Sequence, residues 1–173
     1  MAATPPTGLV GDACVLIDFA DANEPVLGLI ARHVARVIVP TPVLAEVGSL
    51  DELKCAALGL EVLEPTLDQL REAAVAHPKL SFADKTCLIV ARDGGFTCLT
   101  NDGPLGDECA AKAVPVVRGL RPLLVLVECG ALSVTTAVGT VELIAESNPY
   151  ITPAIVQDFR RLAKEAEARW RGP

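Results

Sequence analysis

The sequence predicts a single α/β domain, in which a central parallel sheet of about four to five strands is covered by helices on both faces in three layers. The chain has 173 residues, which suits one compact domain. Hydrophobic residues make up 51% of the chain and charged residues 21%, so there is enough apolar surface to build a core. Short apolar runs alternate with segments of helical spacing, which is the pattern of strands joined by helices in a parallel sheet.

Five short apolar runs are the predicted strands, and the segments between them carry helical spacing. We expect the first 120 residues or so to form the α/β core and the rest to add two or three helices to the same domain. The strands are residues 9–11, 37–39, 60–63, 97–99 and 114–117; the core is residues 8–119, and the C-terminal helices are residues 120–173.

Two kinds of signal mark the helix starts. A hydroxyl residue directly before a proline places a cap before the first helical position. A hydroxyl residue followed three residues later by an acid or an amide is a capping box. The first signal occurs at Thr41-Pro42 and Thr152-Pro153, and the second at Thr66 with Gln69 and at Ser81 with Asp84.

Composition narrows the classes of function. The formal net charge of −7 means that a nucleic-acid partner would require local basic patches, or metal ions that bridge carboxylates to phosphate. Aromatic residues make up only 3%, which argues against a single-strand binder built on stacking platforms. The six cysteines form no C-x-x-C pair and there are two histidines, so no zinc site is expected and the thiols suit a reducing cytosol.

Neither a signal peptide nor a membrane span is expected. Residues 1–7 lack a basic and then apolar pattern, and the longest apolar run, residues 123–132, is interrupted by Glu128 and is too short for a bilayer. We therefore expect a cytoplasmic protein with no membrane partner.

Four acidic residues stand at positions that would converge in such a fold. Asp12 directly follows the first predicted strand, and Asp102 follows the fourth. Glu46 is expected one to two turns into the helix after the second strand, and Asp84 opens the helix before the fourth. Ligands of open parallel sheets bind beyond the carboxyl ends of the strands, so all four would project toward one edge.

Each of these residues also has a purely structural interpretation. Asp12 would cap the helix that follows it, and Asp84 would be the acidic member of a capping box. Asp102 before a glycine is an ordinary turn residue, and Glu46 would be a solvated helix residue. Four carboxylates packed together repel one another and raise each other's pKa, so such a cluster makes physical sense mainly as a site for a divalent cation. Hard carboxylate oxygens suit Mg²⁺ or Mn²⁺.

Four segments of the chain, in the expected order over residues 9–119, resemble the motifs of the PIN-domain family, and especially the VapC-type ribonuclease toxins and related prokaryotic PIN proteins. They are an aspartate before an apolar stretch, a helix after a proline that delivers a glutamate, a helix start with an aspartate, and a Thr-x-Asp at a strand end. The residues that carry the resemblance are Asp12 to Phe19, Val39 to Val47, Leu80 to Arg92 and Leu99 to Asp102. Ala13 and Cys14 depart from the usual hydroxyl and polar residues of the first motif, which puts the level of activity in doubt.

The resemblance implies a metal-dependent endoribonuclease in which Asp12, Glu46, Asp84 and Asp102 are catalytic. Asp12, Asp84 and Asp102 would bind Mg²⁺ or Mn²⁺ directly or through water, while Glu46 would hold a metal-bound water or act as the general base. Asp18 competes with Asp12 for the first place, but the order of the motif favours Asp12 and puts Asp18 at the rim or surface.

Four further residues are candidates for supporting roles. The Thr100 hydroxyl would position a water or a carboxylate, and Asp107 would be a fifth acidic residue near the site. Lys85 and Arg92 are seven residues apart and share a helix face, where they would contact RNA phosphate or form an ordinary solvated face.

The resemblance also implies partners and leaves alternatives open. A toxin-like ribonuclease would have RNA as its substrate, an antitoxin protein that covers the acidic pocket, and a homodimeric state. The apolar segment 122–132 would serve either as a dimer surface or as core. The first alternative function is a catalytically weak or inactive PIN-like scaffold that binds protein or RNA. A phosphatase or phospho-acceptor receiver domain fits less well, because no lysine follows a late strand as such sites require.

Overall fold

The sheet is five-stranded and entirely parallel, as the sequence predicts. The computed structural model describes residues 6–171, without the side chain of Arg171. The strand order across the sheet is β3-β2-β1-β4-β5. The strands are β1 (Leu9–Gly11), β2 (Val37–Pro40), β3 (Glu61–Leu63), β4 (Thr97–Leu99) and β5 (Val116–Val117).

The first strand in the chain lies at the centre of the sheet. Leu9 of β1 is in register with Val37 of β2 on one side and with Thr97 of β4 on the other. The chain adds β2 and β3 on one side of β1 and then returns to add β4 and β5 on the other. The carboxyl ends of β1 and β4 therefore flank the point where the strand order reverses, which is where open parallel sheets bind their ligands.

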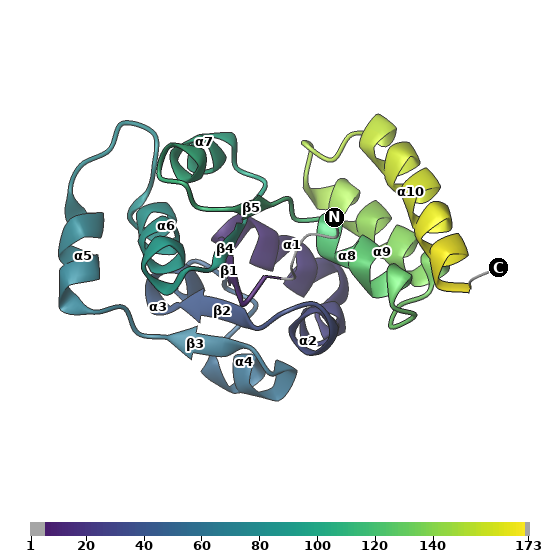
Figure 1. Cartoon of the computed structure of the whole chain (residues 1–173), viewed down its shortest axis with the longest axis horizontal. Coiled ribbons are helices and arrows are strands. Elements are labelled where there is room, and N and C mark those ends of the chain that lie inside the picture. The colour runs from purple at the N-terminus through teal and green to yellow at the C-terminus, as the bar shows by residue number, and fades with distance from the viewer. Residues whose placement is uncertain (1–5, 172–173) are drawn as a thin grey trace.

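Helices cover both faces of this sheet and give the three layers expected (Figure 1). One layer has α6 at its centre with α3, α5 and α7 beside it. The other layer begins with α1 and α2, and α8, α9 and α10 pack outside them. The helices are α1 (Ala13–Asn23), α2 (Pro25–His33), α3 (Thr41–Leu44), α4 (Glu52–Leu58), α5 (Leu67–Ala74), α6 (Phe82–Gly94), α7 (Gly103–Ala111), α8 (Arg121–Glu128), α9 (Val134–Ser147) and α10 (Pro153–Arg171).

The predicted helix starts are confirmed in three of four cases. Both capping boxes form, one at the start of α5 and one at the start of α6. Thr152 accepts a hydrogen bond from the Ile155 amide, so it caps α10. Thr41 is not a cap, because helix α3 already begins at that residue and its hydroxyl donates to Glu64 instead.

The apolar segment after β5 belongs to the core. Leu123 and Leu126 of α8 are fully buried, and α8 packs against α2, α9 and α10. Of the two roles considered for this segment, the structure confirms the core role. Among residues 6–171, no helix has the length and apolar character that crossing a membrane requires.

Candidate active site

Asp12 is a buried carboxylate at the carboxyl end of β1. It caps α1 by accepting a hydrogen bond from the Val15 amide on Oδ1, at 2.8 Å. Its second oxygen accepts a hydrogen bond from the Thr100 hydroxyl, and only 2% of the residue is exposed. The capping interpretation is therefore confirmed, but capping engages only one of the two oxygens.

Thr100 joins the ends of β1 and β4. Its hydroxyl donates to Asp12 and accepts a hydrogen bond from the Asp102 amide at 2.9 Å. Asp102 in turn caps α7 by accepting from the Leu105 amide at 2.7 Å. Asn101 occupies the intervening turn, where its Oδ1 accepts from the amide of Gly119. One hydroxyl therefore fixes the Asp12 carboxylate relative to the Asp102 backbone, which is the supporting role predicted for Thr100.

Asp84 belongs to α6, which lies in the helical layer on the other face of the sheet from α1. It is half-buried in the first turn of α6, where its Oδ2 accepts from the Ser81 amide at 2.8 Å while the Ser81 hydroxyl accepts from the Asp84 amide at 3.0 Å. In the carboxylates of Asp84 and Asp102, the hydrogen bonds among residues 6–171 reach one oxygen each, namely Oδ2 of Asp84 and Oδ1 of Asp102. Each of these carboxylates thus keeps one oxygen available to a ligand.

Glu46 lies in a different setting from the one predicted. Helix α3 ends at Leu44, so Glu46 lies in the turn just beyond it and is exposed, instead of one to two turns inside a longer helix. The turn is stabilised by hydrogen bonds from the amides of Glu46 and Val47 to carbonyls within α3. Glu46 reaches the site from the end of a short helix, where it is less constrained than the other three carboxylates.

The charges of the four acidic residues act on one another. The pKa of Asp12 is raised to about 6. Burial is the main cause and the charges of Asp84 and Asp102 add to it, while the hydrogen bonds from Thr100 and Val15 act in the opposite direction. Burial also raises the pKa of Glu46, and the Asp84 charge adds to the effect. Side chains from separate segments are therefore close enough to feel each other's charge, with Asp84 as the shared neighbour.

Cys14 is an exposed thiol among these carboxylates, a position that sequence reasoning treated only as a departure from the usual motif. Burial of the thiol and the charge of Asp12, followed by those of Asp84 and Asp102, raise its pKa to about 11. The thiol is therefore protonated and neutral at pH 7, and it adds no negative charge to the cluster.

The remaining candidate residues lie away from this cluster or are already paired. Asp107 is exposed on α7, and no hydrogen bond or ion pair of the described residues joins it to Asp12 or Asp84. Lys85 donates to the Val75 carbonyl. The supporting role predicted for Asp107 and the RNA-binding role predicted for Lys85 stay predictions.

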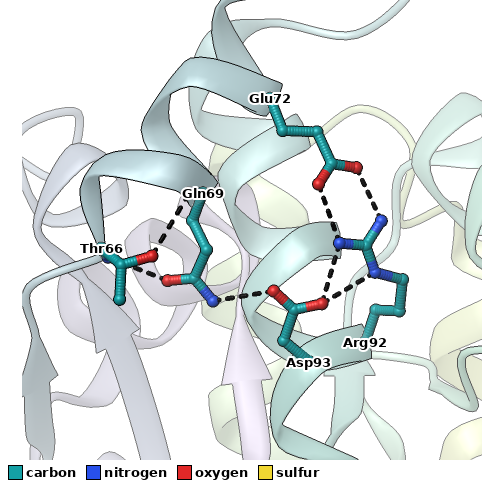
Figure 2. Close-up of polar contacts among 5 residues, drawn as sticks. All are labelled: Thr66, Gln69, Glu72, Arg92 and Asp93. Carbon is teal, nitrogen blue, oxygen red and sulfur yellow. Dashed lines mark hydrogen bonds and ion pairs between the residues drawn. The ribbon is translucent and has the colours of Figure 1, made fainter.

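Arg92 is part of a polar network between α5 and α6 (Figure 2). Its guanidinium donates to both carboxylate oxygens of Glu72, at 2.6 and 2.9 Å, and to Asp93. Gln69 of the α5 capping box donates to Asp93 at 3.0 Å and closes the network. This network clamps α5 to α6, which carries Asp84.

Asp12, Asp84 and Asp102 offer carboxylate oxygens, which are the ligands that a hard divalent cation prefers. Within residues 6–171, no three histidine, cysteine, aspartate or glutamate side chains are grouped closely enough to hold a metal ion directly. Mg²⁺ commonly keeps several waters and binds through only one or two carboxylates, so this arrangement is compatible with water-mediated coordination.

A cavity beside Asp102 was not predicted from the sequence. It has a volume of about 570 Å³ and lies between the start of α1, the turn before α7 and the loop that joins α9 to α10. Asp18, predicted at the rim or surface, is half-buried in its wall, where both of its oxygens accept from Asn148. The partners are 130 residues apart, and no local pattern indicates their contact.

No protein-family model matches this chain, and no curated protein sequence matches it either.

Replacing Thr100 by valine is expected to lower the free energy of unfolding by about 1–3 kcal/mol, because the Asp12 carboxylate and the Asp102 amide each lose a buried partner. It is also expected to raise the pKa of Asp12 further, since the hydrogen bond from Thr100 lowers it. Denaturant unfolding and NMR titration of the carboxylate would measure the two effects. Thr100→Ser keeps the hydroxyl and serves as the control; equal behaviour of the two variants would contradict the assigned role.

Because Arg92 and Glu72 are partners in the network of Figure 2, a comparison of variants at the two positions can distinguish a structural role of Arg92 from an RNA-binding role. Arg92→Ala and Glu72→Ala are each expected to lower the free energy of unfolding by about 1 kcal/mol, since both remove the same partly exposed ion pair. If Arg92 also binds RNA phosphate, only Arg92→Ala weakens RNA binding and reduces its salt dependence. Filter binding at two salt concentrations tests this, and equal affinity of the two variants would restrict Arg92 to clamping α5.

Proposed function

We propose that this protein is a cytoplasmic, Mg²⁺- or Mn²⁺-dependent endoribonuclease of the PIN type. The observation that carries the proposal is the buried Asp12 carboxylate at the carboxyl edge of the sheet, which lies within reach of the charges of Asp84 and Asp102. These residues come from three separate segments, and two of them flank the reversal of strand order. A buried carboxylate with a pKa near 6 beside two others is unfavourable without a compensating cation.

In this proposal the chain supplies carboxylate oxygens as ligands for a cation that keeps part of its water. Asp12, Asp84 and Asp102 would hold the cation directly or through water, and Thr100 keeps the Asp12 carboxylate in place. A bound divalent ion would neutralise charge on the phosphoryl oxygens and lower the pKa of water. Glu46, exposed and beside Asp84, would accept the proton that the attacking water loses as it forms its bond to phosphorus.

The toxin-like role, with an antitoxin that covers the acidic pocket and a homodimeric state, forms the finer part of the proposal. It is supported by the resemblance of the four motifs and by the openness of the site toward solvent at Glu46 and Cys14. Co-expression of the neighbouring gene product, followed by measurement of RNA cleavage with and without it, tests the regulatory partner.

A second function, that of a non-catalytic scaffold, is favoured by one specific observation. Asp12, Asp84 and Asp102 each accept hydrogen bonds that stabilise a helix start, so each has a structural reason to be acidic. A scaffold would bind RNA or a protein without cleaving it.

Cleavage of a labelled single-stranded RNA pool distinguishes the two functions. The protein is incubated with Mg²⁺, with Mn²⁺ or with excess chelator, and the products are mapped. We expect internal cleavage that requires either metal and is abolished by the chelator. Binding without cleavage under all three conditions would support the scaffold instead.

A further inference from the structure

The proposed ribonuclease would have to hold a negatively charged strand beside four carboxylates, although the chain itself carries a formal net charge of −7. Every nucleotide of RNA adds a phosphate charge, so a positive side chain near the site would favour binding. The two cations considered from the sequence already have partners, because Arg92 binds Glu72 and Lys85 donates to the Val75 carbonyl. A further cation, Arg118, stands at the carboxyl edge of the sheet itself.

Arg118 directly follows β5. Strand β5 is parallel to β4, and the Thr100 amide donates to the Val117 carbonyl at 3.1 Å. The order β1-β4-β5 therefore places Asp12, Asp102 and Arg118 one after another along the carboxyl edge. The charge along this edge changes from negative at the ends of β1 and β4 to positive at the end of β5.

Two hydrogen bonds fix the backbone around Arg118. The Gly119 amide donates to Oδ1 of Asn101 at 2.9 Å, and the Arg121 amide donates to the Arg118 carbonyl at 2.9 Å. A Cβ atom at position 119 would come within 2.7 Å of Nδ2 of Asn101, so the glycine lets the two turns pack closely. The turn that carries Arg118 is thus fixed against the turn that leads to Asp102.

The guanidinium of Arg118 lies against α7. A Cβ atom added to Gly106 would be 3.4 Å from Nη2 and 3.5 Å from Nη1, so the guanidinium rests on the bare backbone of the helix at this point. Its Nη1 also donates to the Asp102 carbonyl at 3.5 Å. Arg118 is exposed, and none of the ion pairs among residues 6–171 includes it. The guanidinium therefore lies beside Asp102 with N–H donors still available to an anion.

We propose that Arg118 is a positioning residue that binds an RNA phosphate next to the one that is cleaved. The inference rests on the proposed ribonuclease function and extends it to the path of the strand. Strands β1 and β5 are two strand spacings apart, about 10 Å, so Arg118 contacts a neighbouring phosphate and not the one at Asp12. A guanidinium donates two parallel N–H bonds to phosphate oxygens, which suits this role. RNA bound in this way crosses the carboxyl edge of the sheet from β1 toward β5.

The binding of a short fluorescein-labelled single-stranded RNA, followed by fluorescence anisotropy in excess chelator, tests the contact without cleavage. Arg118→Ala is expected to weaken binding about tenfold, as for the loss of one hydrogen-bonded charge contact. It should also reduce the slope of log affinity against log salt concentration by about 0.7, the value for one phosphate contact on a single strand. Arg118→Lys keeps the charge but not the paired donors, so it should restore the slope and only part of the affinity.

The matched control is Arg32→Ala. Arg32 is likewise exposed and outside the ion pairs of residues 6–171, but it lies in the last turn of α2, which leads into β2 at the amino edge of the sheet. The affinity and salt slope of this variant should equal those of the wild-type protein. In cleavage assays with metal, Arg118→Ala should raise KM about tenfold and leave kcat unchanged, because the contact is the same in the bound substrate and in the transition state.

Equal affinity and equal salt slope of Arg118→Ala and Arg32→Ala would overturn the inference. Metal-dependent cleavage with the same KM in both variants would remove the Arg118 contact and leave the nuclease. A salt slope that depends on Arg118, without cleavage by the wild-type protein, would support the contact and remove the nuclease. Neither binding nor cleavage of RNA by the wild-type protein would overturn both. If a glutamate-rich peptide bound through Arg118 and RNA did not, Arg118 would belong to a protein interface and the inference would fail.

Discussion

Asp84→Asn is expected to reduce Mg²⁺- or Mn²⁺-dependent RNA cleavage at least about a hundredfold. Loss of a residue that only orients metal ligands typically costs 10- to 100-fold, so loss of a ligand that also acts on Asp12 and Glu46 should reach the upper end or beyond. The asparagine removes the negative charge, which is what the cation requires, and keeps nearly the same shape.

The fold should survive this substitution, because an asparagine side chain can still accept the hydrogen bond from the Ser81 amide that closes the capping box. The matched control is Asp68→Asn, which removes an exposed carboxylate from the first turn of α5, outside the site. Circular dichroism checks folding, and product formation from labelled RNA measures activity. Full cleavage of RNA by Asp84→Asn in the presence of metal would contradict the assignment of Asp84 to the active site.

Mn²⁺ is expected to raise the melting temperature at pH 7 and to lose this effect as the pH falls through about 6. The pKa of Asp12 is about 6 in the folded protein and 3.8 ordinarily, so the folded state binds the proton more tightly. The carboxylate therefore lowers stability as the pH rises from about 4 to 6, by about 3 kcal/mol once it is fully ionised. A cation that binds the ionised carboxylate offsets this cost only above pH 6.

The increase in the free energy of unfolding depends on the concentration of Mn²⁺ relative to its dissociation constant. At a Mn²⁺ concentration one hundred times that constant, the increase is about 2.7 kcal/mol. Melting curves at pH 5 and pH 7, with and without Mn²⁺, measure it. Asp12→Asn should show neither the loss of stability with rising pH that is due to this group nor the gain from Mn²⁺. An equal gain from Mn²⁺ at both pH values, or in the variant, would place the cation elsewhere.

The sequence predicts the sheet well because its signals are local. Residues 9–11 and 97–99 are apolar runs bounded by polar turns, and both are strands at the predicted positions. The capping boxes at Thr66 and Ser81 are equally local, since their hydrogen bonds span three residues. The order of the strands and the place of β1 at the centre depend on long connections, which no single segment encodes.

The features that sequence reasoning missed depend on distant contacts. Glu46 was expected one to two turns into the helix after the second strand, but α3 stops at Leu44 and the chain turns toward α4. The cavity requires Asp18 and Asn148 to meet across 130 residues. In the sequence, residues 148–152 indicate only a connection between two helices. Their place beside α1 follows from the packing of α9 on α1.

The central place of β1 has a consequence for the newborn chain. Asp12 is synthesised early, but its hydroxyl partner Thr100 follows 88 residues later. Strand β4, which ends just before Thr100, must pair with β1 before the carboxylates can come together. A fragment that ends before residue 97 would lack Thr100 and Asp102, so under the proposed function it should be inert toward RNA although it contains the other three acidic residues.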